Sequence, residues 1–189
     1  MKPLFVISFI VCLFFITTSA YSGPNHSSAC RLDADYTNHS YENIVSDIDI
    51  ETHAVPYEND KMYMAVVAQN VSNLDTYQVE IHFDPESLTF IGGHEAVPFS
   101  GIDNILTRCG GNTIGFQAVE NDPGIITMAN ALVGNNTSEA PEGSGILGIL
   151  GFVVKKQTAT DLILKNVFFM DSTGSKDTIT KVSGIQLNE

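Results

Sequence analysis

The stretch TYQVEIHFDPESLTFIGG, residues 76–93, alternates apolar and polar residues, breaks at Asp84-Pro85 and then becomes apolar again. Strict alternation is typical of a β-strand with one buried face, because successive side chains point to opposite sides. Pro85 ends the ladder because it has no N–H to donate and biases the residue before it to extended geometry. The stretch therefore predicts a strand, a corner and a second strand in another sheet. The expected core side holds Tyr77, Val79, Ile81 and Phe83, and the outward side holds Thr76, Gln78, Glu80 and His82.

The same period of two runs through the chain from residue 44 onward, interrupted by Gly, Pro, Asn and Asp clusters that are typical of turns. No sustained helical spacing is present after the N-terminal segment. This pattern predicts an all-β fold, a nine-stranded two-sheet β-sandwich with jelly-roll topology. The expected strands are 44–52, 61–71, 76–83, 87–92, 112–119, 124–134, 145–155, 160–171 and 177–187.

The N-terminal residues predict export. Lys2 precedes an uncharged apolar run over residues 4–16, and small residues follow up to Ala20. A basic start, a short apolar run and a small-residue cleavage site are typical of a signal peptide, here 1–20. Residues 21–43 are polar and lack periodicity, so we expect an N-terminal arm or linker there, followed by one domain over 44–189. The expected location is secreted or extracellular, with the periplasm or cell surface as alternatives.

The charge and the cysteines limit the partners. A formal net charge of −13 disfavours nucleic acid and anionic membranes, because binding to phosphates needs Lys and Arg. Outside the signal segment, Cys30 and Cys109 either form one disulfide in an oxidising compartment or remain free thiols. Two cysteines and histidines without ligand spacing do not make a structural metal site. We therefore expect no metal and no cofactor.

Four segments in order resemble a cohesin domain. They are AQNVSNLDTYQVEIHFDPESLTFIGG, GIITMANALVG, GSGILGILGFVVKK and LILKNVFFMDSTG. The similarity covers about residues 44–189. Cohesins are jelly-roll modules, structurally akin to one group of carbohydrate-binding modules, that bind dockerins and gather polysaccharide-degrading enzymes. The resemblance implies a non-catalytic module whose protein partner is a dockerin-like domain on a secreted enzyme, with the calcium motif on the partner.

The resemblance also implies a binding face that includes the strand before Asp-Pro and the strand ending in Val-Lys. On the second strand, an inward set of Ile146, Leu150, Phe152 and Val154 leaves other apolar residues pointing outward. Such residues indicate either a strand covered on both faces or an exposed patch for a partner, and the absence of a predicted helix to cover the outside favours the patch. Cellulosomal cohesins often carry Asn and Asp where Thr76 and Gln78 stand, which is a departure from the family. The expected binding residues are Thr76, Gln78, Glu80, His82, Ala129, Ala131, Leu147, Ile149 and Val153.

Three alternatives remain at this stage. Direct binding to polysaccharide is one, although the chain has no Trp and only Tyr57 and Tyr63 are candidates for an aromatic platform. A structural or adhesive extracellular role is another. Catalysis has little support, because no nucleophile motif is present and a carboxylate pair cannot be placed from the sequence. The segment DSTGSKD, 171–177, has the look of a calcium loop but is better explained as a hairpin turn.

Overall fold

The computed structural model describes residues 23–38, 50–96, 103–134 and 140–189. The described residues contain strands and two short 3-10 helices, and no α-helix is found among them. The elements are β1 Ala29–Asp33, η1 Tyr36–Asn38, β2 His53–Ala54, β3 Lys61–Val71, β4 Leu74–His82, β5 Leu88–His94, η4 Ile105–Thr107, β6 Gln117–Asp122, β7 Ile125–Ala131, β8 Gly143–Val154, β9 Thr160–Asp171, β10 Lys176–Thr178, β11 Lys181–Ser183 and β12 Ile185–Leu187.

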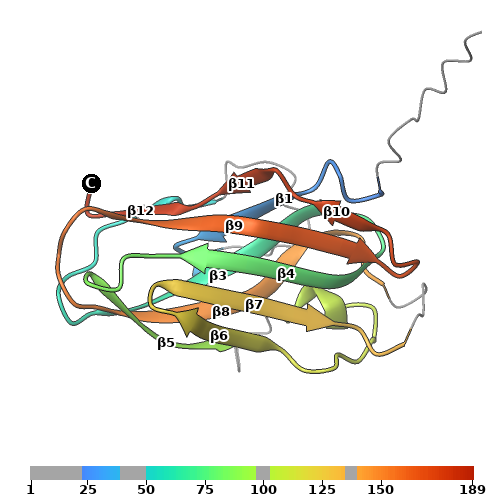
Figure 1. Cartoon of the computed structure of the whole chain (residues 1–189), viewed down its shortest axis with the longest axis horizontal. Helices are drawn as coiled ribbons and strands as arrows, with labels where there is room; N and C mark the ends of the chain where they lie inside the picture. The colour runs from blue at the N-terminus through green and yellow to red at the C-terminus, as the bar shows by residue number, and fades with distance from the viewer. Residues whose placement is uncertain (1–22, 39–49, 97–102, 135–139) are drawn as a thin grey trace, which may run out of the picture.

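The strands form two sheets packed face to face. One sheet has five strands in the order β11-β1-β3-β8-β5, and the other has seven, in the order β2-β12-β9-β4-β7-β6 with β10 also paired to β9. In Figure 1, β9, β4, β7 and β6 run across the picture one below another, and β3 and β8 of the five-stranded sheet pass behind them. The predicted all-β sandwich is confirmed. The strand count differs, because the expected strand 177–187 is divided into β10, β11 and β12 and because β1 forms where no strand was expected.

The core lies between the two sheets. Tyr77, Val79 and Ile81 of β4 are completely buried there, as the alternation predicts. Leu150 and Phe152 of β8 face them from the other sheet and belong to the same cluster. The Phe152 ring packs edge-on against Phe83, with ring centroids 5.3 Å apart. The inward sides of β4 and β8 therefore supply the centre of the hydrophobic core.

The corner at Asp84-Pro85 forms as predicted. The Asp84 carboxylate accepts hydrogen bonds from the backbone N–H of Glu86 and the hydroxyl of Ser87. The Asp84 carbonyl accepts from the N–H groups of Ser87 and Leu88, 3.1 and 3.0 Å away. These bonds turn the chain out of β4, in the seven-stranded sheet, and into β5, in the five-stranded sheet. The corner thus changes sheets, as the sequence indicated.

The expectation of an N-terminal arm or linker over 21–43 is wrong for residues 29–33. Ala29–Asp33 forms β1, which lies between β11 and β3 in the five-stranded sheet. Asn25 is completely buried, and its side chain accepts from Ser72 N–H at 2.8 Å and donates to Ser72 C=O at 3.0 Å. The backbone N–H groups of Gly23 and Asn25 bond to the Asp177 carboxylate. The sandwich therefore begins well before residue 44. The predicted signal segment and most of the predicted strand 44–52 lie outside the described residues.

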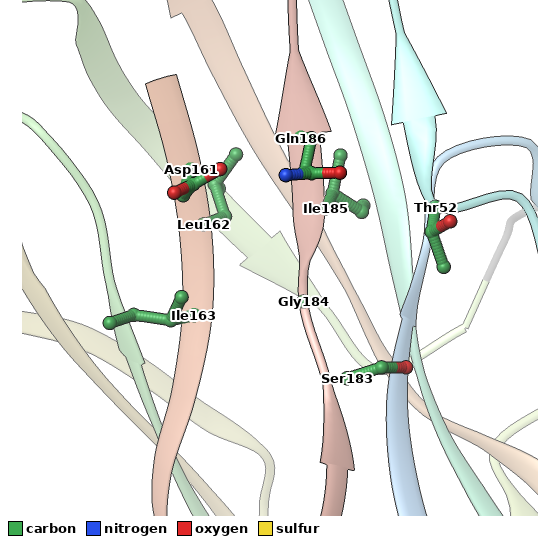
Figure 2. Close-up of a pocket in the computed structure, with 8 residues that line it drawn as sticks. All are labelled: Thr52, Asp161, Leu162, Ile163, Ser183, Gly184, Ile185 and Gln186. Carbon is green, nitrogen blue, oxygen red and sulfur yellow. The ribbon is translucent and has the colours of Figure 1, made fainter. Parts of the chain in front are cut away.

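The C-terminal segment joins the two sheets. β11 pairs with β1 in one sheet, and β12 pairs with β9 in the other, so the chain crosses from sheet to sheet at Gly184. A Cβ on Gly184 would lie 1.9 Å from the Leu162 carbonyl oxygen, so only glycine fits at this crossing. Figure 2 shows Gly184 in the segment that joins β11 to β12, beside β9, where an open groove of about 340 Å³ lies.

The hairpin expected at 171–177 is present between β9 and β10. Asp171 N–H donates to Ser175 C=O, and the Asp171 carboxylate accepts from the N–H groups of Thr173 and Ser175 and from the Thr173 hydroxyl. Burial opposes ionisation of Asp171, but these hydrogen bonds outweigh it and hold the pKa of the carboxyl below its usual range. Within the described parts of the chain, no helix is long and apolar enough to cross a membrane.

Candidate functional site

The two strands expected to share one binding face lie in different sheets. β4 pairs with β7 and β9, whereas β8 pairs with β3 and β5. The outward side chains of β4 and those of β8 therefore point away from each other on opposite surfaces of the sandwich. The single face predicted from the sequence is wrong, and its two halves must be considered separately.

The half on β8 is largely buried. Leu147 is in the core between the sheets and has no exposed surface, so the prediction that it points outward is wrong. The register of β3 against β8 shifts between Val66, opposite Gly148, and Val67, opposite Ile146. This β-bulge reverses the alternation along β8, so that Ile146 points outward and Leu147 inward.

The outward side of the same strand is covered by the chain itself. Ile149 is only 2% exposed, and it packs with Ile146 against Ala65 and Val67 of β3. Tyr36 of η1 and Ile50 lie over these four residues, which we call the covered patch. The prediction of an exposed apolar patch is therefore wrong for Ile149. Val153, near the end of β8, remains partly exposed but lies on the five-stranded sheet, apart from the β4 residues.

The half on β4 is open. Its outward residues are half-exposed, and those of β7 lie beside them in register: Thr76 opposite Ala131, Gln78 opposite Ala129 and Glu80 opposite Thr127. β9 on one side and β6 on the other extend this surface, which we call the open face. Its outward side chains are Thr76, Gln78, Glu80, His82, Gln117, Val119, Ile125, Thr127, Ala129, Ala131, Ile163, Lys165, Phe168 and Met170.

Among the side chains of the open face, the charged or ionisable ones, Glu80, His82 and Lys165, lie toward one end. Glu80 accepts a hydrogen bond from the Asn166 amide at 2.7 Å, and its Oε2 lies 3.3 Å from His82 Nε2. Asn166 has a φ of 47° at a bulge in β9, which turns its side chain toward β4. Lys165 stands opposite Glu80 across the ladder. This end of the face therefore carries a fixed carboxylate with cationic or titratable neighbours.

Small, apolar and uncharged polar groups occupy the other end. Ala129 and Ala131 of β7 form a low floor, with Thr76 and Gln78 of β4 on one side, followed by Met170 and Phe168 of β9, and the segment before β6 on the other. The Phe168 ring is covered on one side by Lys176, whose Nζ lies 3.7 Å from the ring centroid. A hollow of about 170 Å³ lies over Ala129 and is bordered by Ile114 and Phe168. The floor is low enough for another backbone or a helix to approach closely.

Sequence reasoning missed the contribution of β9 and of Ile114. In β9, Leu162 and Leu164 are buried on one parity and Val167 and Phe169 on the other. The buried positions change from even-numbered to odd-numbered residues at the bulge at Asn166. This change in the apolar pattern of β9 could have indicated from the sequence that β9 contributes to the open face. Ile114 is 72% exposed although Phe116, two residues later, packs on the core. Gly115 between them, with a φ of 120°, was the corresponding signal.

The two cysteines do not form the possible disulfide. Cys30 of β1 is completely buried in the core, whereas Cys109 is exposed after η4, and both thiols are free. Burial raises the pKa of the Cys30 thiol to about 12, against the smaller opposing effects of the Arg31 charge and backbone N–H. In the described part of the chain, no group of three or more His, Cys, Asp or Glu side chains is arranged to hold a metal ion.

Solved structures with the same arrangement of strands are cohesin modules. The second type II cohesin module of the adaptor ScaA scaffoldin of Acetivibrio cellulolyticus aligns with a TM-score of 0.61 at 19% identity, covering 86% of this chain and 90% of that one. The chain has the cohesin fold. The sixth cohesin of scaffoldin B from the same organism, solved with a Cel5 dockerin, gives a TM-score of 0.59 at 15% identity, with coverage of 85% and 97%.

The cohesin fold also extends to a non-cellulosomal example. A cohesin from the hyperthermophilic archaeon Archaeoglobus fulgidus aligns with a TM-score of 0.54 at 12% identity, covering 85% of this chain and 88% of that one. No family model matches the sequence, and no curated protein sequence matches it either. The resemblance read from the four sequence segments is thus confirmed for the cohesin fold, at identities where the sequence comparison alone finds nothing.

Proposed function

We propose that the chain is a non-catalytic binding module that acts outside the cell and docks a dockerin-bearing partner, such as a polysaccharide-degrading enzyme, through the open face. The observation that carries the proposal is the surface itself: an accessible four-strand face with a floor of Ala129 and Ala131, apolar and uncharged polar groups at one end and charged groups at the other. Protein interfaces typically combine apolar and polar groups in one patch.

The solved cohesin structures with a similar fold support docking of a dockerin, and the burial of the outward side chains supports the open face as the docking surface. The scaffoldin B cohesin was solved in complex with a dockerin. Of the two halves of the predicted face, the one on β4 keeps its outward residues accessible, whereas Tyr36 and Ile50 lie over Ile146 and Ile149 of β8. Within the open face, Glu80 and His82 supply polar contacts that set orientation more than affinity. Leu147 and Ile149 have no part in this proposal.

Calcium-dependent capture tests the proposal. The chain from residue 21, which contains every described strand, is immobilised, incubated with calcium-loaded dockerin modules and with the host's secreted proteins, and eluted with a chelator. We expect specific capture that chelation reverses, because a dockerin needs its metal to fold. Ala129→Arg should weaken capture by at least about 100-fold, since a long charged side chain would stand on the floor of the interface.

Thr89→Arg is the matched control, because Thr89 is exposed on β5 at the edge of the other sheet. It should leave capture unchanged, and both variants should keep the wild-type melting temperature. Loss of capture in Thr89→Arg together with full capture in Ala129→Arg would move the site to the five-stranded sheet. An empty eluate would refute dockerin binding.

Direct carbohydrate binding is the second candidate, favoured by one observation. Tyr63 of β3 is 38% exposed on the five-stranded sheet and lies against Gly151, where a Cβ would come within 2.8 Å of its ring. An aromatic ring lying on a sheet offers a flat apolar surface to a sugar. Pelleting of the protein with insoluble polysaccharide, abolished by Tyr63→Ala, would support this function, and no pelleting would exclude it for the polysaccharide used.

A further inference from the structure

The hollow at the apolar end of the open face is built by an irregular segment, 112–117, that runs beside β7. Ile114 N–H donates to Ala131 C=O at 2.9 Å, and Gln117 stands opposite Ala129, so the segment continues the line of β6. The four residues from Ile114 to Gln117 thus lie beside three residues of β7, Ala129 to Ala131. Gly115 takes up the extra length with a φ of 120°, which favours glycine.

This bulge sends two neighbouring apolar side chains in opposite directions. Phe116 packs on the core, and a Cβ on Gly148 would lie 2.5 Å from its ring. Ile114 points outward and is 72% exposed, the largest exposure among the large hydrophobic side chains of the described residues. The hollow of about 170 Å³ lies between Ile114, Ala129 and Phe168. Ile114 is therefore the wall of a hollow, and not a core residue left over at the surface.

Glu95, which follows β5, holds this wall in place. One oxygen, Oε1, accepts hydrogen bonds from the Thr113 hydroxyl at 2.9 Å and from the Asn130 amide at 2.7 Å. Thr113 immediately precedes Ile114, and Asn130 immediately follows Ala129. A single carboxylate thus ties the wall to the floor, through bonds of the stronger, charge-assisted kind.

The surroundings of the hollow indicate what it fits. Thr76, Gln78 and Gln117 line its rim, and these side chains are polar but uncharged. The charged residues Glu80 and Lys165 stand in the next row along β4 and β9, and the ammonium group of Lys176 covers one side of the Phe168 ring. The volume is similar to the roughly 150 Å³ of an engineered apolar cavity that accepts benzene. An uncharged apolar group of that size matches both the walls and the rim.

We propose that the hollow receives one apolar side chain, of leucine or phenylalanine size, from the docking partner, and that Glu95 is the positioning residue that sets its wall. This inference rests on the proposed function, because it makes the hollow the anchor point of the open face. Buried apolar anchors that fill a pocket carry most of the binding energy in many interfaces.

A methyl NMR titration with benzyl alcohol tests the hollow without any protein partner. The probe should produce saturable shifts at the methyl groups of Ile114 and Ala129, and none of that size at Val119 or Val182, which are exposed elsewhere. Ala129→Leu should abolish the saturable shifts, because the larger side chain fills the hollow. Shifts that do not saturate, or that are equal at Val182, would overturn the proposal.

Variants of Glu95 test its positioning role. Glu95→Ala removes the acceptor that both Thr113 and Asn130 use, and we expect probe affinity to fall by at least about fivefold. Glu95→Gln keeps an oxygen at the same place and should restore most of that affinity. A Glu95→Ala protein that melts at a lower temperature but binds the probe as tightly as the wild type would limit Glu95 to a structural role and overturn this part.

Binding experiments with a dockerin distinguish a failure of this inference from a failure of the proposed function. With a calcium-loaded dockerin that binds the wild type, Ile114→Ser should weaken binding by about tenfold or more, and Val182→Ser on β11 should not. Dockerin binding that is unchanged in both Ile114→Ser and Ala129→Leu would overturn the hollow as anchor while the proposed function stands. A hollow that saturates with probe in a chain that binds no dockerin would support the hollow and refute the dockerin.

Discussion

The covered patch and the open face are both outward sides of a β-sheet, yet they have opposite compositions and opposite fates. The covered patch consists of Ala65, Val67, Ile146 and Ile149 and is buried beneath Tyr36 and Ile50. The open face mixes Thr, Gln, Glu and His with small and apolar side chains and remains accessible. The comparison teaches that an apolar run on both parities of a strand marks burial on both sides. The mixed, half-exposed strand is the better candidate for a reversible interface.

Introducing an aspartate into the covered patch and into the open face tests whether the two regions differ in burial. Ile149→Asp would bury an unpaired carboxylate under Tyr36 and Ile50, so we expect a loss of about 4 kcal/mol or more in the free energy of unfolding. Val119→Asp on the open face, where Val119 is 47% exposed, should change stability by less than about 0.5 kcal/mol. Urea unfolding followed by circular dichroism measures both. If Ile149→Asp unfolds at the wild-type urea concentration, the patch is not covered in solution.

Asp171 closes the β9–β10 hairpin in the sheet that carries the open face. Its carboxylate should make the stability of this part of the molecule depend on pH. Its pKa is lowered in the folded protein, so the stability it contributes is present above the unfolded pKa of about 3.9 and is lost as pH falls through the folded pKa. Asp171→Asn should therefore reduce stability on the order of 1 kcal/mol near pH 7, as for other capping carboxylates.

The difference between wild type and Asp171→Asn should shrink as the pH is lowered below about 4, where the wild-type carboxyl becomes protonated. Thermal unfolding at a series of pH values measures this convergence. A difference that stays constant down to the lowest pH would mean that the charge of Asp171 adds nothing to the hairpin beyond its hydrogen-bonding shape.

The smallest expected effect concerns the cysteines of the five-stranded side. Cys109 should react with iodoacetamide in the native protein, whereas Cys30, buried and with a raised pKa, should react only after unfolding. A reducing agent should leave the melting temperature unchanged. Protection of both thiols in the native protein, together with a lower melting temperature on reduction, would mean that they are bonded after all.

The sequence predicted most strands but not which surface they share. Alternation located β3, β4, β5, β7, β8 and β9, and Pro85 correctly marked a change of sheet. It missed β1, because five residues in a polar segment show too little periodicity to count. It also placed Leu147 on the wrong side, because a bulge reverses the alternation and nothing in ILGILGFVV fixes where the extra residue falls.

The residues of the candidate site were also predicted only in part. Thr76, Gln78, Glu80, His82, Ala129 and Ala131 were grouped correctly on one surface, since they follow directly from alternation on two strands that pair with each other. Joining them to β8 needed knowledge of sheet membership, which is a property of the whole topology and leaves no mark on a single strand. The hollow depends on Gly115 and on Glu95, and the link between residues 95 and 130 is a long-range contact that no local pattern predicts.

The crossing at Gly184 also bears on how the molecule is made. β1 begins at residue 29 and pairs in parallel with β11, which begins at residue 181, so the five-stranded sheet is complete only after residues 181–183 have left the ribosome. Pairings between such distant residues slow folding, because loop closure must precede the contacts that reward it. Until then the edges of β1 and β9 stay unpaired, and an early product is most exposed to aggregation at those two edges.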